Sequence, residues 1–155
     1  MKHATTRVRG FTLIELIITV FIISILVGVA VPLARNSIQR QKEVELRQAL
    51  RDLRSAIDKY KDASDRGFIQ MKLDTEGYPE KLQVLVDGVD VVGTIGKKFK
   101  PLRRIPVDPM TNSTEWGMRS QQDDPRNNSW GGQNVFDVYT KSQGTALDGT
   151  KYKDW

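Results

Sequence analysis

The chain has 155 residues, a formal net charge of +5 and no cysteine, so it has room for one compact domain beside a long apolar segment but forms no disulfide. Three of the basic residues lie in residues 1–10. Without them the chain has 21 basic and 19 acidic residues, and this near balance does not indicate a nucleic-acid-binding protein. His3 is the one histidine, which excludes a Ser-His-Asp triad and a histidine-rich metal centre.

An apolar segment, residues 11–34, follows this basic tip and contains one charged side chain, that of Glu15. As a helix its 24 residues span about 36 Å, enough to cross a bilayer core. A carboxylate at membrane depth costs a few kcal/mol, so it needs a partner or a function. Three interpretations compete: a secretory signal cleaved after Ala30, an uncleaved signal anchor, and cleavage before the apolar segment, between Gly10 and Phe11.

The stretch GFTLIE, residues 10–15, resembles the class III signal of type IV pilins and type II secretion pseudopilins. Their pattern is a basic leader, a glycine, Phe or Met, and then an apolar helix with Glu at its fifth residue. Gly10, Phe11 and Glu15 match this pattern position by position. The resemblance implies that residues 1–10 are a leader removed by a membrane-embedded prepilin peptidase, which also N-methylates Phe11.

On this interpretation residues 11–34 stay with the product as a transmembrane and assembly helix, and Pro32 lies where many pilin helices carry a proline. A positive tip stays in the cytoplasm, so the rest of the chain is exported. Cleavage creates an amine one helical turn from Glu15, and the two charges attract strongly in apolar surroundings. They can pair within one subunit, whereas the family mechanism pairs Glu15 with the Phe11 amine of the adjoining subunit. A third role for Glu15 is that of a simple helix-start acid.

Residues 35–66 are predicted to be the amphipathic second half of the same helix, ending near Arg66–Gly67 because glycine stops a helix. Gly28 and Pro32 are expected to kink or locally unwind the junction between the halves. Apolar residues at spacings of four and three predict a core face, widened by two further residues: Leu46, Leu50, Leu53, Ile57 and Tyr60, with Val44 and Ala49.

Residues 67–155 are expected to form a globular part on the exported side of the membrane. Pro79 is predicted to begin a short helix that points three apolar side chains inward: Leu82, Leu85 and Val86. The basic stretch GKKFKPLRR, residues 96–104, is interpreted as a solvated loop.

Two strands are predicted near the end of the chain. The sequence PVDP, residues 106–109, indicates an ordered turn leading into the first of them. The alternating residue pattern of 113–120 and 134–142 predicts two strands, one on each side of a polar loop, residues 121–134.

The order of the downstream motifs resembles the major pseudopilin of type II secretion systems: GYP at 77–79, PVDP at 106–109, WGM at 116–118, FDVY at 136–139, and Trp155. That family typically has G-x-YP after its long helix, a P-x-DP turn, an aromatic-rich strand pair and often a terminal Trp; the spacer of its first motif is missing here. The resemblance implies an α+β fold, in which a long N-terminal helix packs on a small C-terminal antiparallel sheet and loop domain. The absence of cysteine favours a pseudopilin over type IV pilins proper, which often close their C-terminal region with a disulfide.

Major pseudopilins hold calcium in the loop after their last strand, and the resemblance implies Asp148 and Asp154 as ligands here. Calcium takes several hard oxygens from a flexible loop, and residues 140–155 offer these two carboxylates and backbone carbonyls. The family's LGADG is replaced by TKSQGT, which lacks its aspartate, and Lys151 and Lys153 add opposing charge. The alternative is an Asp-Gly turn followed by a solvated tail.

The function that the resemblance implies is that of a structural subunit of a type II secretion pseudopilus. Such a subunit is stored in the bacterial inner membrane, with its N-terminus cytoplasmic and its C-terminal domain periplasmic, and polymerises through its helix to drive protein export. Expected partners are further copies in a helical homopolymer, prepilin peptidase, an inner-membrane assembly platform and ATPase, and minor pseudopilins, with no nucleic acid.

Two alternatives of other kinds stay open. One is a type IV pilin, major or minor, that displays residues 121–134 in adhesion, motility or DNA binding. The other is an exported enzyme on a signal anchor. No paired-acid, phosphate-loop, histidine or cysteine motif speaks for the enzyme, so catalysis is not expected.

Overall fold

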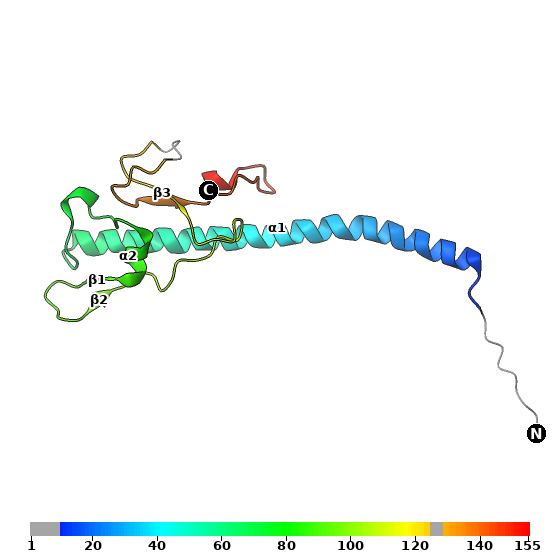
Figure 1. The fold of residues 1–155 in the computed structure, drawn as a ribbon, viewed down its shortest axis with the longest axis horizontal. Helices are drawn as coiled ribbons and strands as arrows, with labels where there is room; N and C mark the ends of the chain where they lie inside the picture. The colour runs from blue at the N-terminus through cyan, green and yellow to red at the C-terminus, as the bar shows by residue number, and fades with distance from the viewer. Residues whose placement is uncertain (1–9, 125–128) are drawn as a thin grey trace, which may run out of the picture. The chain divides into compact units, whose positions relative to one another are not determined.

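A computed structural model describes residues 10–124 and 129–155, without the side chains of Val29 and Pro32. Two units, Met1–Ile38 and Gln39–Trp155, divide the chain, and one helix runs through both (Figure 1). The elements in chain order are α1 (Leu13–Asp65), η1 (Leu73–Thr75), α2 (Leu82–Asp87), β1 (Val89–Asp90), β2 (Lys98–Phe99), β3 (Gly117–Arg119), β4 (Asp137–Tyr139) and η2 (Tyr152–Asp154).

The first unit is the apolar part of α1. An 18-residue window of this helix has a mean hydropathy of 2.9, and none of it is buried. By length and composition α1 can therefore cross a membrane, although a signal sequence near an N-terminus has the same properties. The helix is continuous through Gly28 and Pro32, so the expected local unwinding at the junction is wrong. Proline removes one backbone hydrogen bond, and the flanking turns keep the helix intact.

The second unit is built on the amphipathic half of α1, and its predicted core face is confirmed. The side chains of Leu46, Leu50, Leu53, Ile57 and Tyr60 are buried together with Ala49. Val44 was expected to join them but is 61% exposed. It precedes Leu46 by two residues, and positions two apart on a helix do not share a face.

The predicted end of α1 is also confirmed, and its geometry explains the glycine. Gly67 has a φ of +71°, a left-handed conformation that glycine adopts without a Cβ penalty. Its N–H bonds to the carbonyl of Ser64 at 3.0 Å, and the N–H of Phe68 bonds to the carbonyl of Ala63 at 2.9 Å. This pair of bonds is a Schellman motif, which satisfies the last free carbonyls of the helix.

The next elements, α2 and the β1–β2 hairpin, cover the C-terminal part of α1 (Figure 1). The predicted short helix is present as α2, with Leu82 and Leu85 buried and Val86 half-buried, but it begins at Leu82 and not at Pro79, which lies outside the helix. The solvated-loop interpretation of residues 96–104 is wrong in part, because Lys98–Phe99 forms strand β2, antiparallel to β1. The Phe99 side chain packs on the core while the neighbouring lysines stay exposed.

The two predicted strands near the end of the chain are confirmed, although β3 and β4 have only three residues each. They pair antiparallel, with Gly117 opposite Tyr139 and Arg119 opposite Asp137. A Cβ added to Gly117 would lie 2.4 Å from the Tyr139 ring, so this glycine lets the ring lie across its neighbour. The Arg119 guanidinium stacks on the same ring at 4.4 Å from its centroid.

The PVDP turn before β3 is ordered by the buried carboxylate of Asp108. One oxygen accepts from the Met110 N–H at 2.8 Å, and the other accepts from the Thr111 hydroxyl at 3.0 Å and from the Thr140 hydroxyl. Because Thr140 directly follows β4, this carboxylate fastens the turn to the sheet. The expected α+β fold is thus present, with a long helix and small antiparallel sheets.

Candidate processing and assembly site

The start of α1 is organised by Thr12. Its hydroxyl oxygen accepts a hydrogen bond from the Glu15 N–H at 3.3 Å, and its carbonyl accepts one from the Leu16 N–H at 3.2 Å. Thr12 is therefore the N-cap, and Thr-x-x-Glu is the sequence of a capping box. The sequence analysis gave Thr12 no role, although its spacing from Glu15 is the signal that would have identified it as the N-cap.

The hydroxyl groups of the apolar segment have their partners within the helix. Thr19 and Ser24 each donate to a carbonyl three or four residues earlier, at 2.9 and 2.8 Å, and Thr12 caps the helix. Such bonds allow a hydroxyl to lie in an apolar environment without an unsatisfied group. In the part of the chain that the structure describes, no hydrogen bond or ion pair engages the Glu15 carboxylate. Glu15 is thus the polar group that this segment leaves unsatisfied.

The predicted cleavage site lies directly before the N-cap. Gly10 and Phe11 precede the helix, and both are exposed. Among the described residues, a Cβ added to Gly10 would meet nothing within 4 Å, so packing against them does not require glycine there. Residues 1–9 of the predicted leader lie outside the described residues. The Pro32 backbone is part of α1, whereas its side chain lies outside the described residues.

The candidate calcium ligand Asp148 already has partners of its own. Its carboxylate accepts from the Thr150 hydroxyl at 2.6 Å and from the Thr150 N–H at 2.9 Å. The Arg47 guanidinium lies 3.5 Å away on α1. The Thr150 hydrogen bonds, followed by the charge of Arg47, lower the pKa of the Asp148 carboxyl from its ordinary value.

The C-terminal segment that contains Asp148, Tyr152 and Trp155 is held on α1. Three side chains spaced four residues apart on the helix make the contacts: Gln39, Glu43 and Arg47. Gln39 donates to the Tyr152 hydroxyl oxygen at 2.9 Å, and that hydroxyl donates to Glu43 at 2.9 Å. The Arg47 guanidinium lies 4.1 Å from the centre of the Trp155 ring. The sequence interpretation missed these contacts, because nothing local to α1 indicates what its polar face contacts.

These contacts bear on the predicted calcium site. Asp154 belongs to η2, and no group of three or more histidine, cysteine, aspartate or glutamate residues that could hold a metal occurs within residues 10–124 and 129–155. Calcium takes six to eight oxygens, so backbone carbonyls and water must supply most of them here, beside the positive charge of Arg47. The donor set fits calcium poorly, and the site stays a prediction.

A calcium titration tests that prediction. If Asp148 and Asp154 bind the ion, millimolar calcium raises the melting temperature of the full-length protein in detergent, because a ligand that binds the folded state stabilises it. The double variant Asp148→Asn, Asp154→Asn then loses the increase, and magnesium at the same concentration serves as the control cation. A melting temperature that calcium leaves unchanged in the unsubstituted protein contradicts the prediction.

Comparisons with known proteins match the sequence of the N-terminal segment and most of the chain. Residues 5–31 match the family model described as "Prokaryotic N-terminal methylation motif". The chain is 29% identical over 118 residues to the type II secretion system core protein G of Escherichia coli strain K12, an alignment that covers 71% of this chain and 72% of that protein. No solved structure matches the chain.

The two matches support a type IV pilin-like protein that resembles a major pseudopilin. Both are matches to structural subunits of this kind and not to an enzyme, as the sequence analysis expected. Together with the apolar helix, they support anchoring in a membrane.

Proposed function

We propose that this protein is a filament subunit of a type II secretion pseudopilus. A prepilin peptidase cleaves it between Gly10 and Phe11 and methylates the new amine. The product waits in the bacterial inner membrane, with residues 11–34 as its anchor and residues 39–155 on the periplasmic side. It then polymerises through this helix and so drives protein export.

The unpartnered carboxylate of Glu15 is the observation that carries the proposal. The hydroxyls of Thr12, Thr19 and Ser24 are satisfied within the helix, so the segment is suited to an apolar environment except at this one position. A charge in such surroundings is costly unless an opposite charge neutralises it. The amine that cleavage creates at Phe11 is such a charge, and in a filament an adjoining subunit presents another.

The surroundings of Gly10 support a role for the peptidase. A Cβ at this position would lie within 4 Å of no described atom beyond the chain neighbours of Gly10, and glycine there suits a partner that approaches the backbone closely. Phe11 is exposed beside it, at the start of a helix that is capped from Thr12 onward. The bond to be cut thus lies in an accessible, non-helical stretch.

The apolar side chains of α1 stabilise the filament once the helix has left the lipid. The large ones from Phe11 to Leu33 whose side chains are described are exposed in the isolated chain. Each one that is packed against a neighbouring subunit contributes about 1.5–3 kcal/mol relative to exposure in water. In the membrane, lipid covers the same side chains, so extraction needs an assembly platform and an ATPase. Minor pseudopilins are expected to join the same filament.

A type IV pilin, major or minor, is the alternative, and it would use the same N-terminal chemistry in adhesion, motility or DNA binding. The polar loop 121–134 would be its binding surface. Its described ends are anchored, since Asp123 accepts N–H bonds from Ser120 at 2.7 Å and Gly131 at 3.0 Å. Filaments confined to the periplasm favour the pseudopilus, and filaments on the cell surface favour the pilin.

Intact-mass analysis of the protein isolated from membranes tests the proposed processing. We expect a product that begins at Phe11 and carries one methyl group. Co-expression with an inactivated prepilin peptidase is the control and should give a chain that still carries the leader. A mature product that begins at Val31, or a retained Met1 in the presence of active peptidase, contradicts the proposal.

A further inference from the structure

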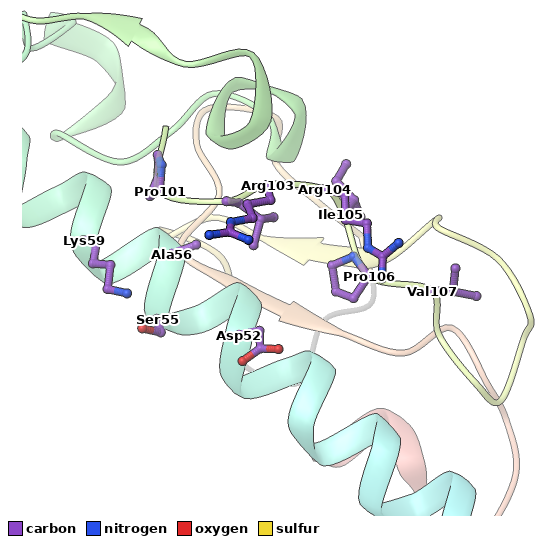
Figure 2. A pocket seen from close by; sticks show the side chains of 11 residues that line it. Asp52, Ser55, Ala56, Lys59, Pro101, Arg103, Arg104, Ile105, Pro106 and Val107 are labelled. Atoms are coloured by element: carbon purple, nitrogen blue, oxygen red, sulfur yellow. The ribbon is translucent and has the colours of Figure 1, made fainter. Parts of the chain in front are cut away.

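A groove of about 580 Å³ lies between α1 and the loop that leads to the PVDP turn. Ala56 on α1 and Pro101, Leu102, Ile105 and Pro106 in the loop give it an apolar lining. Figure 2 shows Arg103 reaching from the loop toward α1, where Asp52 and Lys59 line the opposite wall. A groove of this volume accommodates several side chains of a protein partner.

The charged side chains of this groove are mostly positive and unpaired. Lys59, Arg103 and Arg104 are exposed, and within the described residues no hydrogen bond or ion pair engages their charged groups. The one acid of the lining, Asp52, accepts a hydrogen bond from Gln48 at 2.7 Å. A second depression adjoins the groove at Lys59 and Pro101. It is lined by Lys97, Lys100 and one acid, Asp62, which is paired with Arg66 at 2.8 Å. The groove thus selects an occupant that is apolar at its tip and acidic at its sides.

The same chain carries such a feature in the turn after α1. The side chain of Leu73 is 97% exposed, and Asp74 and Glu76 beside it are exposed acids. The two cations near this turn are paired with other acids: Lys72 with Glu80 at 2.7 Å, and Lys61, which lies beside Gly77, with Asp65 at 2.5 Å. We call Leu73, Asp74 and Glu76 the acidic knob.

The backbone of the acidic knob is ordered by contacts within its own turn, and Gln122, which lies after β3, adds a contact to Glu76. The side chain of Thr75 is buried and donates to the Lys72 carbonyl at 3.1 Å. Glu76 accepts a hydrogen bond from Gln122 at 2.9 Å, and the Tyr78 N–H bonds to the Thr75 carbonyl at 3.0 Å. A preorganised knob loses little conformational entropy when it binds.

We infer that the acidic knob of one copy docks in the basic groove of the next copy. Leu73 enters the apolar lining, and Asp74 and Glu76 face Arg103, Arg104 and Lys59. The inference rests on the proposed filament, which brings copies into repeated contact, and it names a contact in residues 39–155 beyond the N-terminal helix. Knob and groove are different surfaces of one chain, so the contact is heterologous and extends into a filament instead of closing as a dimer.

Charge distinguishes the acidic knob from the other fully exposed aliphatic side chain of this unit. Ile95 lies at the tip of the β1–β2 hairpin and is fully exposed, but exposed lysines follow it at positions 97 and 98. Those lysines would face the cations of the groove, and like charges brought together disfavour the contact. Ile95 therefore provides a matched control.

Cysteine cross-linking in the full-length protein tests the inference, because the chain has no cysteine of its own. The variant Leu73→Cys, Val107→Cys places one thiol in the knob and one at the groove, where Val107 is exposed. Mild oxidation of its filaments should give a ladder of covalent dimers, trimers and longer multimers. The control Ile95→Cys, Val107→Cys should give none, and single-cysteine variants should give no ladder. In the cysteine-free protein, Leu73→Ser should raise the subunit concentration needed for filaments roughly tenfold or more, whereas Ile95→Ser should not.

The outcomes separate this inference from the proposed function. Filaments that are intact by electron microscopy but yield no ladder overturn the knob-and-groove contact and leave the proposed filament standing. A ladder of equal strength from the Ile95 control also overturns it, because the groove would then not discriminate by charge. If the unsubstituted protein forms no filaments, the proposed function fails and the inference falls with it.

Discussion

Replacing Glu15 by alanine is expected to leave cleavage after Gly10 unchanged and to abolish filament assembly. The peptidase acts on a bond before the helix, whereas the carboxylate is needed once the helix is buried among other copies. Removing one member of a buried ion pair costs about 3–5 kcal/mol, which lowers the association constant for each added subunit by a factor of at least about 100. Intact-mass analysis reports cleavage, and electron microscopy of the sheared membrane fraction reports filaments.

Two control variants separate the proposed pairing from other effects of losing Glu15. Glu45→Ala removes an exposed carboxylate on the same helix that accepts a hydrogen bond from Gln41 at 3.1 Å, and it should assemble normally. Thr12→Ala removes the cap at a cost of about 1 kcal/mol to the helix, so it should weaken assembly without abolishing it. Normal filaments from the Glu15 variant would contradict the pairing, and loss of filaments in the Thr12 variant would assign the effect to capping.

Asp108→Ala is expected to give the largest loss of stability in residues 39–155. The substitution leaves the Thr111 and Thr140 hydroxyls and the Met110 N–H without their acceptor, at a site where the carboxylate is fully buried. Unsatisfied donors of this kind cost about 1–3 kcal/mol each, so the free energy of unfolding should fall by about 3–5 kcal/mol. Thermal unfolding of the full-length protein in detergent should show a melting temperature lower by roughly 10 °C or more.

Asp58→Ala is the matched control for that experiment. Asp58 is exposed, and in the described part of the chain no hydrogen bond or ion pair engages its carboxylate. Its replacement by alanine, a strong helix former, should change the free energy of unfolding by no more than about 0.5 kcal/mol. Equal melting temperatures for the two variants would show that the Asp108 carboxylate does not hold the turn to the sheet.

The sequence predicted best what depends on neighbours along the chain. The core face from Leu46 to Tyr60 follows from a helical period that one face of one helix must obey, and the stop at Gly67 follows from local backbone geometry. Val44 was wrongly assigned to the core face because its hydrophobicity was considered without its angular position around the helix. The Gly10, Phe11 and Glu15 pattern is also local, and the family model matches the residues that contain it.

What the sequence did not predict depends on contacts between distant residues. Strand β2 lies in a stretch rich in lysine, and only its pairing with β1 and the packing of Phe99 on the core make it a strand. Arg54 bonds to Asp137 at 2.7 Å and to the Trp155 carbonyl at 2.9 Å, a pairing that no periodicity indicates. The surroundings of Asp148 were unpredictable for the same reason, since Arg47 lies about a hundred positions earlier.

The hydrogen bond between Gln39 and Tyr152 can form only late in the synthesis of the protein. The two residues are 113 positions apart, so at about 5–20 residues per second the ribosome makes the second roughly 5 to 20 s after the first. Throughout that interval the polar face of Gln39, Glu43 and Arg47 lacks the partners that the later segment supplies. A nascent chain arrested at residue 143 would therefore hold a formed helix with this face open to chaperones and proteases.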